Sequence, residues 1–258
     1  MRKRRWSCCA LALLAFGLLS CASNLEVQKK QSRTSRNLGE AYYQRGNYTA
    51  ALREFLKAES IYSDDPFLQY DLGLAYKAKQ RPDLAIIHFK KALKMNPDYA
   101  PAKNSLGAVY LDMGEWDTAI GYFKAVLKNL LYTTPELPMA NLGWAYYNKK
   151  EYRLAEKYYR ESLDLKPNFI YALRGLALTY TAMGKFDDAA KILEDAIKEY
   201  PQAALLYLDL GSLYKKSGDT EKALAAYQKV IGLAPESDLA DKASKEIRNL
   251  NRSSTERQ

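Results

Sequence analysis

Six copies of one short motif recur along this chain at a nearly constant interval. The clearest copy spans residues 141–146 and reads NLGWAY. Its third residue has counterparts at positions 39, 73, 107, 177 and 211, so successive copies lie 34, 34, 36, 34 and 34 residues apart. A fixed period of this size is typical of proteins that stack one supersecondary unit on the next. This period constrains the fold more strongly than any other feature of the sequence.

The repeats predict pairs of helices. In each repeat, apolar residues recur in two stretches with the 3.6-residue period of an amphipathic helix. The first stretch carries Leu, a small residue and Tyr at positions seven, eight and eleven, as in Leu72, Gly73 and Tyr76. The second carries Ala at position twenty and a large residue at twenty-four, as in Ala85 and Phe89. Because small residues let paired helices approach closely, we predict an all-α fold. With Ser32 as position one, the repeats cover residues 32–65, 66–99, 100–135, 136–169, 170–203 and 204–237.

Glycine marks the turn between the two helices of most repeats. A residue in the left-handed conformation often terminates a helix, and glycine adopts that conformation at little cost. Gln80 and Lys150 stand at this position in the second and fourth repeats. The turn glycines are Gly46, Gly114, Gly184 and Gly218.

Taken together, these positions resemble the tetratricopeptide repeat over residues 32–237, with Ala177 in place of glycine in the fifth repeat. The resemblance implies a right-handed superhelical solenoid of six helix pairs, which binds its partners along a concave face. After the last repeat, residues 238–251 are predicted to form a capping helix that covers the end of the stack. Its apolar face carries Leu239, Ala243, Ile247 and Leu250. Residues 252–258 are predicted to be a disordered tail.

Residues 1–20 have the organisation of a signal peptide. Residues 2–5 are basic, and residues 10–19 form an apolar run that is shorter than the roughly 20 residues needed to span a membrane. Two cleavage sites fit the residues that follow. Residues 20–22 suit ordinary secretion, whereas residues 18–21 (LLSC) resemble the bacterial lipoprotein box, although Leu19 is larger than the residue usual there.

The cysteine content favours the lipoprotein interpretation. Cys8 and Cys9 would leave with the signal, and Cys21 would be the single cysteine of the mature chain. Lipid attachment explains such a lone thiol in an exported protein, the alternative being an unpaired thiol in a flexible terminus. We therefore predict lipidation at Cys21 and a polar, non-helical tether over residues 21–31. Ala22 and Ser23 lack the aspartate that often retains such lipoproteins in the inner membrane, which implies the periplasmic face of the outer membrane.

The charge distribution argues against nucleic-acid binding. The formal net charge is +9, but four of the basic residues belong to the predicted signal peptide. The remaining basic residues are mixed with acidic ones along the predicted helices, which is typical of a solvated surface.

The sequence offers no catalytic or metal-binding constellation. Its one histidine, His88, stands at position twenty-three of the second repeat, where a packed or solvent-facing side chain is the simplest interpretation. No Cys or His pair has the spacing of zinc ligands, and no Gly-Lys-Ser/Thr loop is present to bind phosphate. We therefore expect a non-enzymatic binding protein without cofactor, metal or small-molecule substrate.

The predicted binding surface follows from the resemblance. In tetratricopeptide repeats the concave face is formed by positions two, five, nine, twelve and thirteen of the first helix. Chaperone-docking members clamp a peptide carboxylate with Lys at five and Asn at nine, a pattern absent here. The centre of the face is instead apolar and aromatic, which suits an amphipathic or apolar peptide segment, unless these side chains pack within their own repeats. The predicted partner-binding residues are Tyr43, Tyr70, Leu74, Leu111, Trp144, Tyr147, Arg174 and Leu178.

The period breaks once, between the third and fourth repeats, where two residues are added. Tyr132, Pro135 and Glu136, followed by residues 141–143 (NLG), resemble a segment of the type IV pilus biogenesis/stability lipoproteins, the PilF/PilW-type pilotins. Those proteins are also lipid-anchored arrays of six tetratricopeptide repeats. The resemblance implies binding of secretin subunits and assistance to their localisation and assembly in the outer membrane. The alternative is an adaptor for cell-wall hydrolases or other outer-membrane assembly factors.

Overall fold

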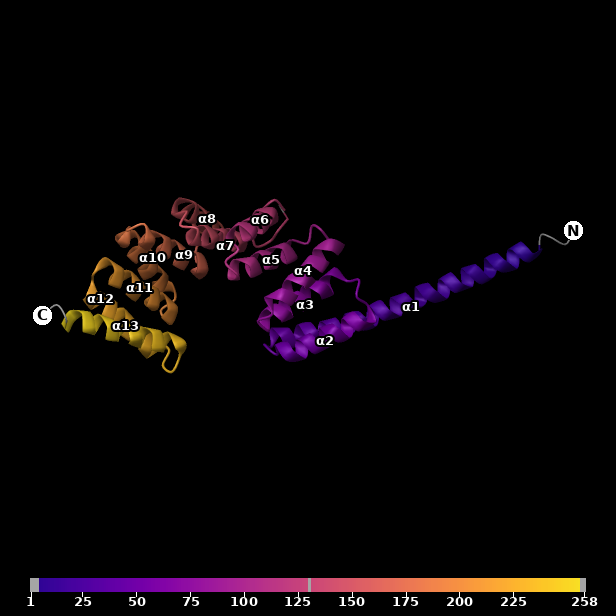
Figure 1. Ribbon diagram of the computed structural model, residues 1–258, viewed down its shortest axis with the longest axis horizontal. Helices are drawn as coiled ribbons and strands as arrows, with labels where there is room; N and C mark the ends of the chain where they lie inside the picture. The colour runs from indigo at the N-terminus through magenta and orange to yellow at the C-terminus, as the bar shows by residue number, and fades with distance from the viewer. Residues whose placement is uncertain (1–4, 130, 256–258) are drawn as a thin grey trace. The chain divides into compact units, whose positions relative to one another are not determined.

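The computed structural model describes residues 5–129 and 131–255, and it describes side chains from position 24 to position 252. Among these residues all regular secondary structure is helical, which confirms the predicted all-α class (Figure 1). The helices are α1 (Arg5–Gln44), α2 (Tyr48–Ile61), α3 (Pro66–Ala78), α4 (Pro82–Met95), α5 (Ala100–Asp112), α6 (Trp116–Leu127), α7 (Glu136–Asn148), α8 (Tyr152–Leu165), α9 (Ile170–Ala182), α10 (Phe186–Glu199), α11 (Ala204–Ser217), α12 (Thr220–Leu233) and α13 (Asp238–Thr255).

The chain divides into two compact units, one reaching to Val109 and the other beginning at Tyr110, so that α5 contributes to both. In the first unit α1 packs on α2 and α3 packs on α4. In the second unit the corresponding pairs are α7 with α8, α9 with α10 and α11 with α12. The first helices of neighbouring pairs also touch: α1 contacts α3, α7 contacts α9, and α9 contacts α11. Within each unit the first helices therefore share one face, the face to which the predicted binding residues belong.

The two helices of a repeat approach closely because a glycine of the first helix faces a ring of the second. A Cβ atom added at Gly73 would lie 2.4 Å from the ring of Phe89, and one added at Gly143 would lie 2.8 Å from the ring of Tyr159. Both distances are shorter than any that real Cβ atoms show. The aromatic residue at position twenty-four thus requires glycine at position eight. Gly39 with Phe55 and Gly211 with Tyr227 repeat the arrangement.

The fifth repeat departs from this pattern at both positions together. Ala177 occupies position eight and Leu193 occupies position twenty-four, and both side chains are buried. A methyl group on the first helix thus accompanies a smaller, aliphatic side chain on the second. The larger residue at position 177 is therefore compensated by the smaller Leu193 of the same helix pair.

The turn residues adopt the left-handed conformation that the sequence predicts. Gly46, Gly114 and Gly184 have φ of +75°, +79° and +75°. Gln80 and Lys150 take the same conformation at the equivalent positions, with φ of +58° and +61°. The turn geometry is thus kept where the glycine is lost, at some cost in backbone strain.

The N-terminal prediction of a non-helical tether is wrong for the described residues, because α1 continues through residues 24–31 (Figure 1). This segment contains no glycine or proline, and its Glu, Gln and Lys residues favour helix. Glu26 also pairs with Lys29 across one turn, at 2.9 Å. A polar helix of this kind has no apolar period by which to recognise it. The side chain of Cys21, the predicted lipidation site, lies outside the described residues, as do those of residues 1–20.

The C-terminal helix is longer than predicted. α13 extends to Thr255, so residues 252–255 are helical rather than part of a disordered tail, and residues 256–258 lie outside the described part. Ala243 and Leu250 are buried in a cluster with Tyr227 and Val230, which closes the last helix pair. Among the described residues, no helix combines the length and the apolar character needed to cross a bilayer.

We predict that Gly73→Ala destabilises the first unit by about 1–3 kcal/mol, because the added methyl group overpacks the contact with Phe89. Phe89→Leu, which reproduces the combination found in the fifth repeat, should restore part of this loss in the double variant. Denaturant unfolding of the two single variants and the double variant measures the coupling. Strictly additive losses would contradict the proposed dependence of glycine on the ring.

Candidate partner-binding site

The first unit has a cavity of about 220 Å³ on the shared face of α1 and α3. Two of the predicted binding residues, Tyr43 and Leu74, line it. Tyr70, a third, is half-buried and packs edge-on against Tyr99, with 5.2 Å between the ring centroids. The structure therefore brings Tyr43 and Leu74 together and places Tyr70 in a neighbouring aromatic contact. The complete lining is Glu40, Tyr43, Gln44, Phe55, Asp71 and Leu74.

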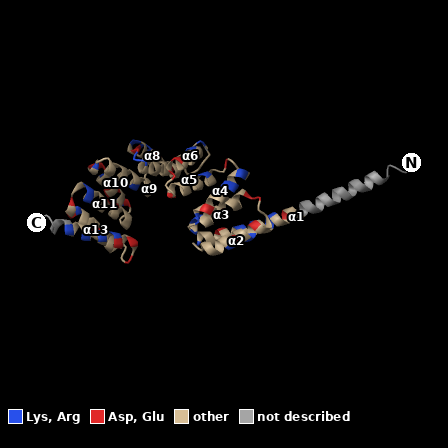
Figure 2. Ribbon diagram, in the orientation of Figure 1, with Lys and Arg blue, Asp and Glu red and all other residues tan. Residues whose placement is uncertain are grey.

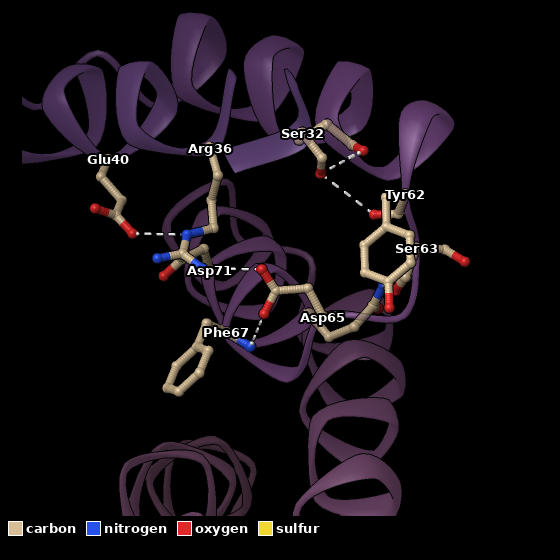
Figure 3. Close-up of polar contacts among 10 residues, drawn as sticks. Ser32, Arg36, Glu40, Tyr62, Ser63, Asp65, Phe67 and Asp71 are labelled. Atoms are coloured by element: carbon tan, nitrogen blue, oxygen red, sulfur yellow. Dashed lines mark hydrogen bonds and ion pairs between the residues drawn. The ribbon is translucent and has the colours of Figure 1, made fainter. Parts of the chain in front are cut away.

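Beside this cavity, one arginine faces three carboxylates (Figure 3). Arg36 of α1 donates from Nη1 to Asp65 at 2.9 Å and from Nε to Glu40 at 3.1 Å. Its Nε also lies 3.4 Å from Oδ2 of Asp71, in an ion pair without a hydrogen bond. The guanidinium is mostly buried and stacks over the ring of Phe67, 5.6 Å from its centroid. Arg36 therefore cannot neutralise all three acidic groups.

Asp71 is the least satisfied of these carboxylates. Burial, together with the neighbouring carboxylate of Glu40, raises its pKa to about 8 against the opposing charge of Arg36. Its Oδ2 has no hydrogen-bond partner and is shielded from solvent. At neutral pH the folded state therefore favours the protonated form of Asp71, next to an ionised Arg36.

The second unit carries an aromatic surface on α7. Trp144 and Tyr147 stack with 5.4 Å between centroids and 13° between ring planes, and both are half-buried. Tyr152 adjoins Tyr147 at 5.8 Å. Two flat rings held in this way offer apolar area with little conformational entropy left to lose on binding. The structure thus places Trp144 and Tyr147 side by side on α7, which is the first helix of its repeat.

The packing of α7 with α8 and α9 is tightly constrained around one tyrosine. Tyr159 of α8 is fully buried, its hydroxyl has no hydrogen-bond partner, and burial raises its pKa well above the usual value. A Cβ atom at Gly175 of α9 would lie 2.2 Å from Cζ of this ring. Glycines on two successive first helices, Gly143 and Gly175, thus make room for one tyrosine, which couples α7, α8 and α9.

Arg174 is held inside the chain. Its Nε and Nη2 donate to the two carboxylate oxygens of Asp209, so α9 is tied to α11. Arg36 and Asp71 occupy the same two positions, five of one repeat and six of the next, 35 residues later in each case. We call this pairing the inter-repeat clasp. Sequence reasoning assigned Arg174 to a partner and missed the clasp, although an Arg at position five followed by an Asp at position six of the next repeat was a readable signal.

The remaining predicted residues differ in their exposure. Leu111 of α5 is only 6% exposed, so it offers almost no surface to a partner. Leu178 of α9 is half-buried, one turn after Arg174.

The single histidine packs inside the first unit. His88 is buried, hydrogen bonds through Nδ1 to Gln69 at 2.8 Å and stacks on Tyr76. In the described part of the chain, no group of three or more His, Cys, Asp or Glu side chains is arranged to hold a metal. Lys and Arg lie among Asp and Glu along the helices of each unit (Figure 2).

Family models of the tetratricopeptide repeat match almost the entire repeat region. Models described as "Tetratricopeptide repeat" match residues 66–99, 104–137, 139–169 and 174–238. A model described as "TPR repeat" matches residues 39–80. Together the matches cover well over half of the chain.

Solved structures of two type IV pilus proteins have a similar fold. PilW, described as a "widely conserved type IV pilus biogenesis factor", aligns with a TM-score of 0.75 and 22% identity, over 82% of this chain and 97% of that one. PilF of Pseudomonas aeruginosa aligns with a TM-score of 0.69 and 21% identity, over 85% of this chain and 99% of that one. By sequence, the human intraflagellar transport protein 88 homolog is 28% identical over 118 residues, 44% of this chain but only 14% of that protein.

We predict that the thermal stability of the protein falls as pH rises from about 4 toward 8, through the titration of Asp71. The folded state keeps this proton up to about pH 8, whereas an unfolded Asp loses it near the ordinary value of 3.8, so the folded state binds more protons between the two. Asp71→Asn should remove this part of the pH dependence. Thermal melts across this range test it, with the exposed Asp195→Asn as a control that keeps the wild-type slope. Equal slopes in the wild type and Asp71→Asn would contradict the assignment.

Proposed function

This chain belongs to the tetratricopeptide repeat proteins, and from that premise we propose that it is a lipid-anchored scaffold for type IV pilus biogenesis in the bacterial cell envelope. In this proposal it binds secretin subunits at the periplasmic face of the outer membrane and assists their localisation and assembly. The observation that carries the proposal is the match of its fold to nearly the full length of PilW and PilF. The lipoprotein-like LLSC sequence at residues 18–21 and the single break in the repeat period support it.

A partner-binding role agrees with the family and with the aromatic surface of the second unit. Tetratricopeptide repeat proteins are in general scaffolds for other proteins. The aromatic pair of Trp144 and Tyr147 supplies the kind of rigid, partly exposed anchor that dominates many interfaces. Leu178, on the neighbouring helix α9, adds apolar area. An amphipathic or extended segment of the partner fits this surface better than a small polar ligand.

We propose that membrane anchoring and partner capture reinforce one another. Acyl chains at Cys21 would hold the protein on the membrane where secretin subunits assemble, which raises their effective concentration at the binding face. The helical course of α1 gives this arrangement a defined length. At 1.5 Å per residue, a continuous helix from Cys21 to Ser32 spans about 17 Å, so the first repeat would stand off the anchor on a stiff spacer.

We predict that Trp144→Glu lowers co-purification of secretin subunits with the tagged full-length chain at least about tenfold, since it places a charge in the aromatic pair. Leu154→Glu, at an exposed site on the second helix α8, is the control for an added charge and should retain the secretin. Circular dichroism verifies that both variants keep their helicity. Undiminished secretin with Trp144→Glu excludes this surface, and recovery of cell-wall hydrolases in place of secretin supports the alternative adaptor role.

We predict that Cys21→Ser moves the protein from the membrane fraction to the soluble fraction and abolishes incorporation of labelled fatty acid. Serine lacks the thiol that lipidation requires, while the volume of the side chain hardly changes. Cys8→Ser is the control, because Cys8 lies within the predicted signal peptide. Continued acylation of Cys21→Ser would refute the lipoprotein assignment.

A further inference from the structure

We propose that the cavity of the first unit binds the side chain of a lysine or arginine presented by the partner segment. The inference rests on the proposed partner-binding role of this face and specifies the chemistry of one anchor. Its basis is the meeting, in one cavity, of apolar walls from α1, α2 and α3 with the carboxylates of Glu40 and Asp71.

The shape and lining of the cavity suit one long cationic side chain. At about 220 Å³ it is smaller than the pockets of roughly 300–1,000 Å³ that hold drug-sized ligands, so it matches a side chain better than a whole small molecule. Tyr43 and Leu74 offer apolar surface to the methylene stem of lysine or arginine, whereas Phe55, which also lines the cavity, is only 1% exposed. The carboxylate of Glu40, whose side chain is 39% exposed, offers acceptors to the charged head, and Asp71, 13% exposed, adds a second carboxylate at the cavity wall. The ring of Tyr43 also lines the cavity and suits a cation–π contact.

The charge balance of the cavity calls for a cation. In the second unit, the inter-repeat clasp is complete: both oxygens of Asp209 accept hydrogen bonds from Arg174. In the first unit, Arg36 is divided among Glu40, Asp65 and Asp71, and Oδ2 of Asp71 is left without a hydrogen bond. Positions five and six of successive repeats thus form a fully hydrogen-bonded ion pair in the second unit. In the first unit the same positions leave an excess of acidic groups beside the cavity. A cationic side chain from a partner compensates this excess.

Asp71 gives the proposed site a characteristic pH dependence. A bound cation favours the ionised carboxylate, so binding displaces the proton that burial and Glu40 hold on Asp71 in the free protein. Affinity for a lysine side chain should therefore rise as pH increases through about 8, while the lysine, with an ordinary pKa of about 10.4, remains charged. The titratable and charged groups that face Asp71 are Arg36, Glu40 and Tyr43 on α1, Asp65 before α3 and Tyr99 before α5.

Three pools of immobilised nine-residue peptides test the proposal, with lysine, norleucine or glutamate fixed at the centre and the other positions randomised. The full-length chain, solubilised in detergent, should be captured about tenfold more by the lysine pool than by the norleucine pool, as expected for charge-assisted hydrogen bonds. The combined variant Glu40→Gln with Asp71→Asn should lose this preference. Glu221→Gln, an exposed carboxylate on α12, is the matched control and should keep it.

A second variant guards against loss of folding as the explanation. Glu40 is 39% exposed, so Glu40→Lys leaves the core intact and supplies the missing cation from within the chain. It should shift the preference from the lysine pool to the glutamate pool, which a misfolded protein cannot do. A larger lysine preference at pH 9 than at pH 6 in the wild type would further support the role of Asp71.

The outcomes separate this inference from the proposed function. Equal capture by all three pools, together with retained capture of secretin, overturns the inference that the cavity binds a cationic side chain. The proposed partner-binding face is then unaffected. Lysine preference that persists in the combined variant places the cation site elsewhere and also overturns the inference. No capture by any pool, together with loss of secretin co-purification in the wild type, contradicts the binding face itself and this inference with it.

Discussion

The close approach of a glycine to an aromatic ring within four of the helix pairs is the constraint on which the rest of the fold depends. The ring at position twenty-four occupies the space that a Cβ atom at position eight would need, as Gly73 and Phe89 illustrate. This contact fixes the spacing of the two helices and buries a large apolar surface in a pair too small to form a core alone. Because the pairs then stack through their first helices, these helices present one face in each unit. The candidate binding residues owe their positions to this packing.

Much of the fold was predictable because it is periodic. Helix pairs, turn residues and the partnership of small and large side chains return every 34 residues, so each copy supports the interpretation of the others. The inter-repeat clasp escaped prediction because its two residues belong to different repeats and occur together only at Arg36 with Asp71 and Arg174 with Asp209. The helix over residues 24–31 was not predicted from the sequence, because an exposed, polar helix has no apolar period. The solvent exposure of each candidate binding residue could not be predicted from the sequence either. Leu111 and Leu178 are both leucine, but they differ in burial.

The two units use the same scaffold for different surface chemistry. In the second unit, two stacked rings lie on α7, glycines of α7 and α9 accommodate a buried tyrosine of α8, and the clasp is fully hydrogen bonded. In the first unit, the corresponding clasp leaves acidic groups beside a cavity. The first helices therefore offer an apolar aromatic surface in the second unit and an acidic cavity for a cationic side chain in the first.

The central claim is that the face formed by the first helices holds a secretin segment in the cell envelope. Its most direct test is site-specific photo-crosslinking in living cells, with the photoreactive amino acid at Tyr147 on α7 or at Leu154 on α8, followed by identification of the linked protein. The account predicts a crosslink from position 147 to the outer-membrane secretin and none from position 154. Crosslinks to cell-wall hydrolases without secretin, or secretin crosslinks from position 154 alone, would contradict it.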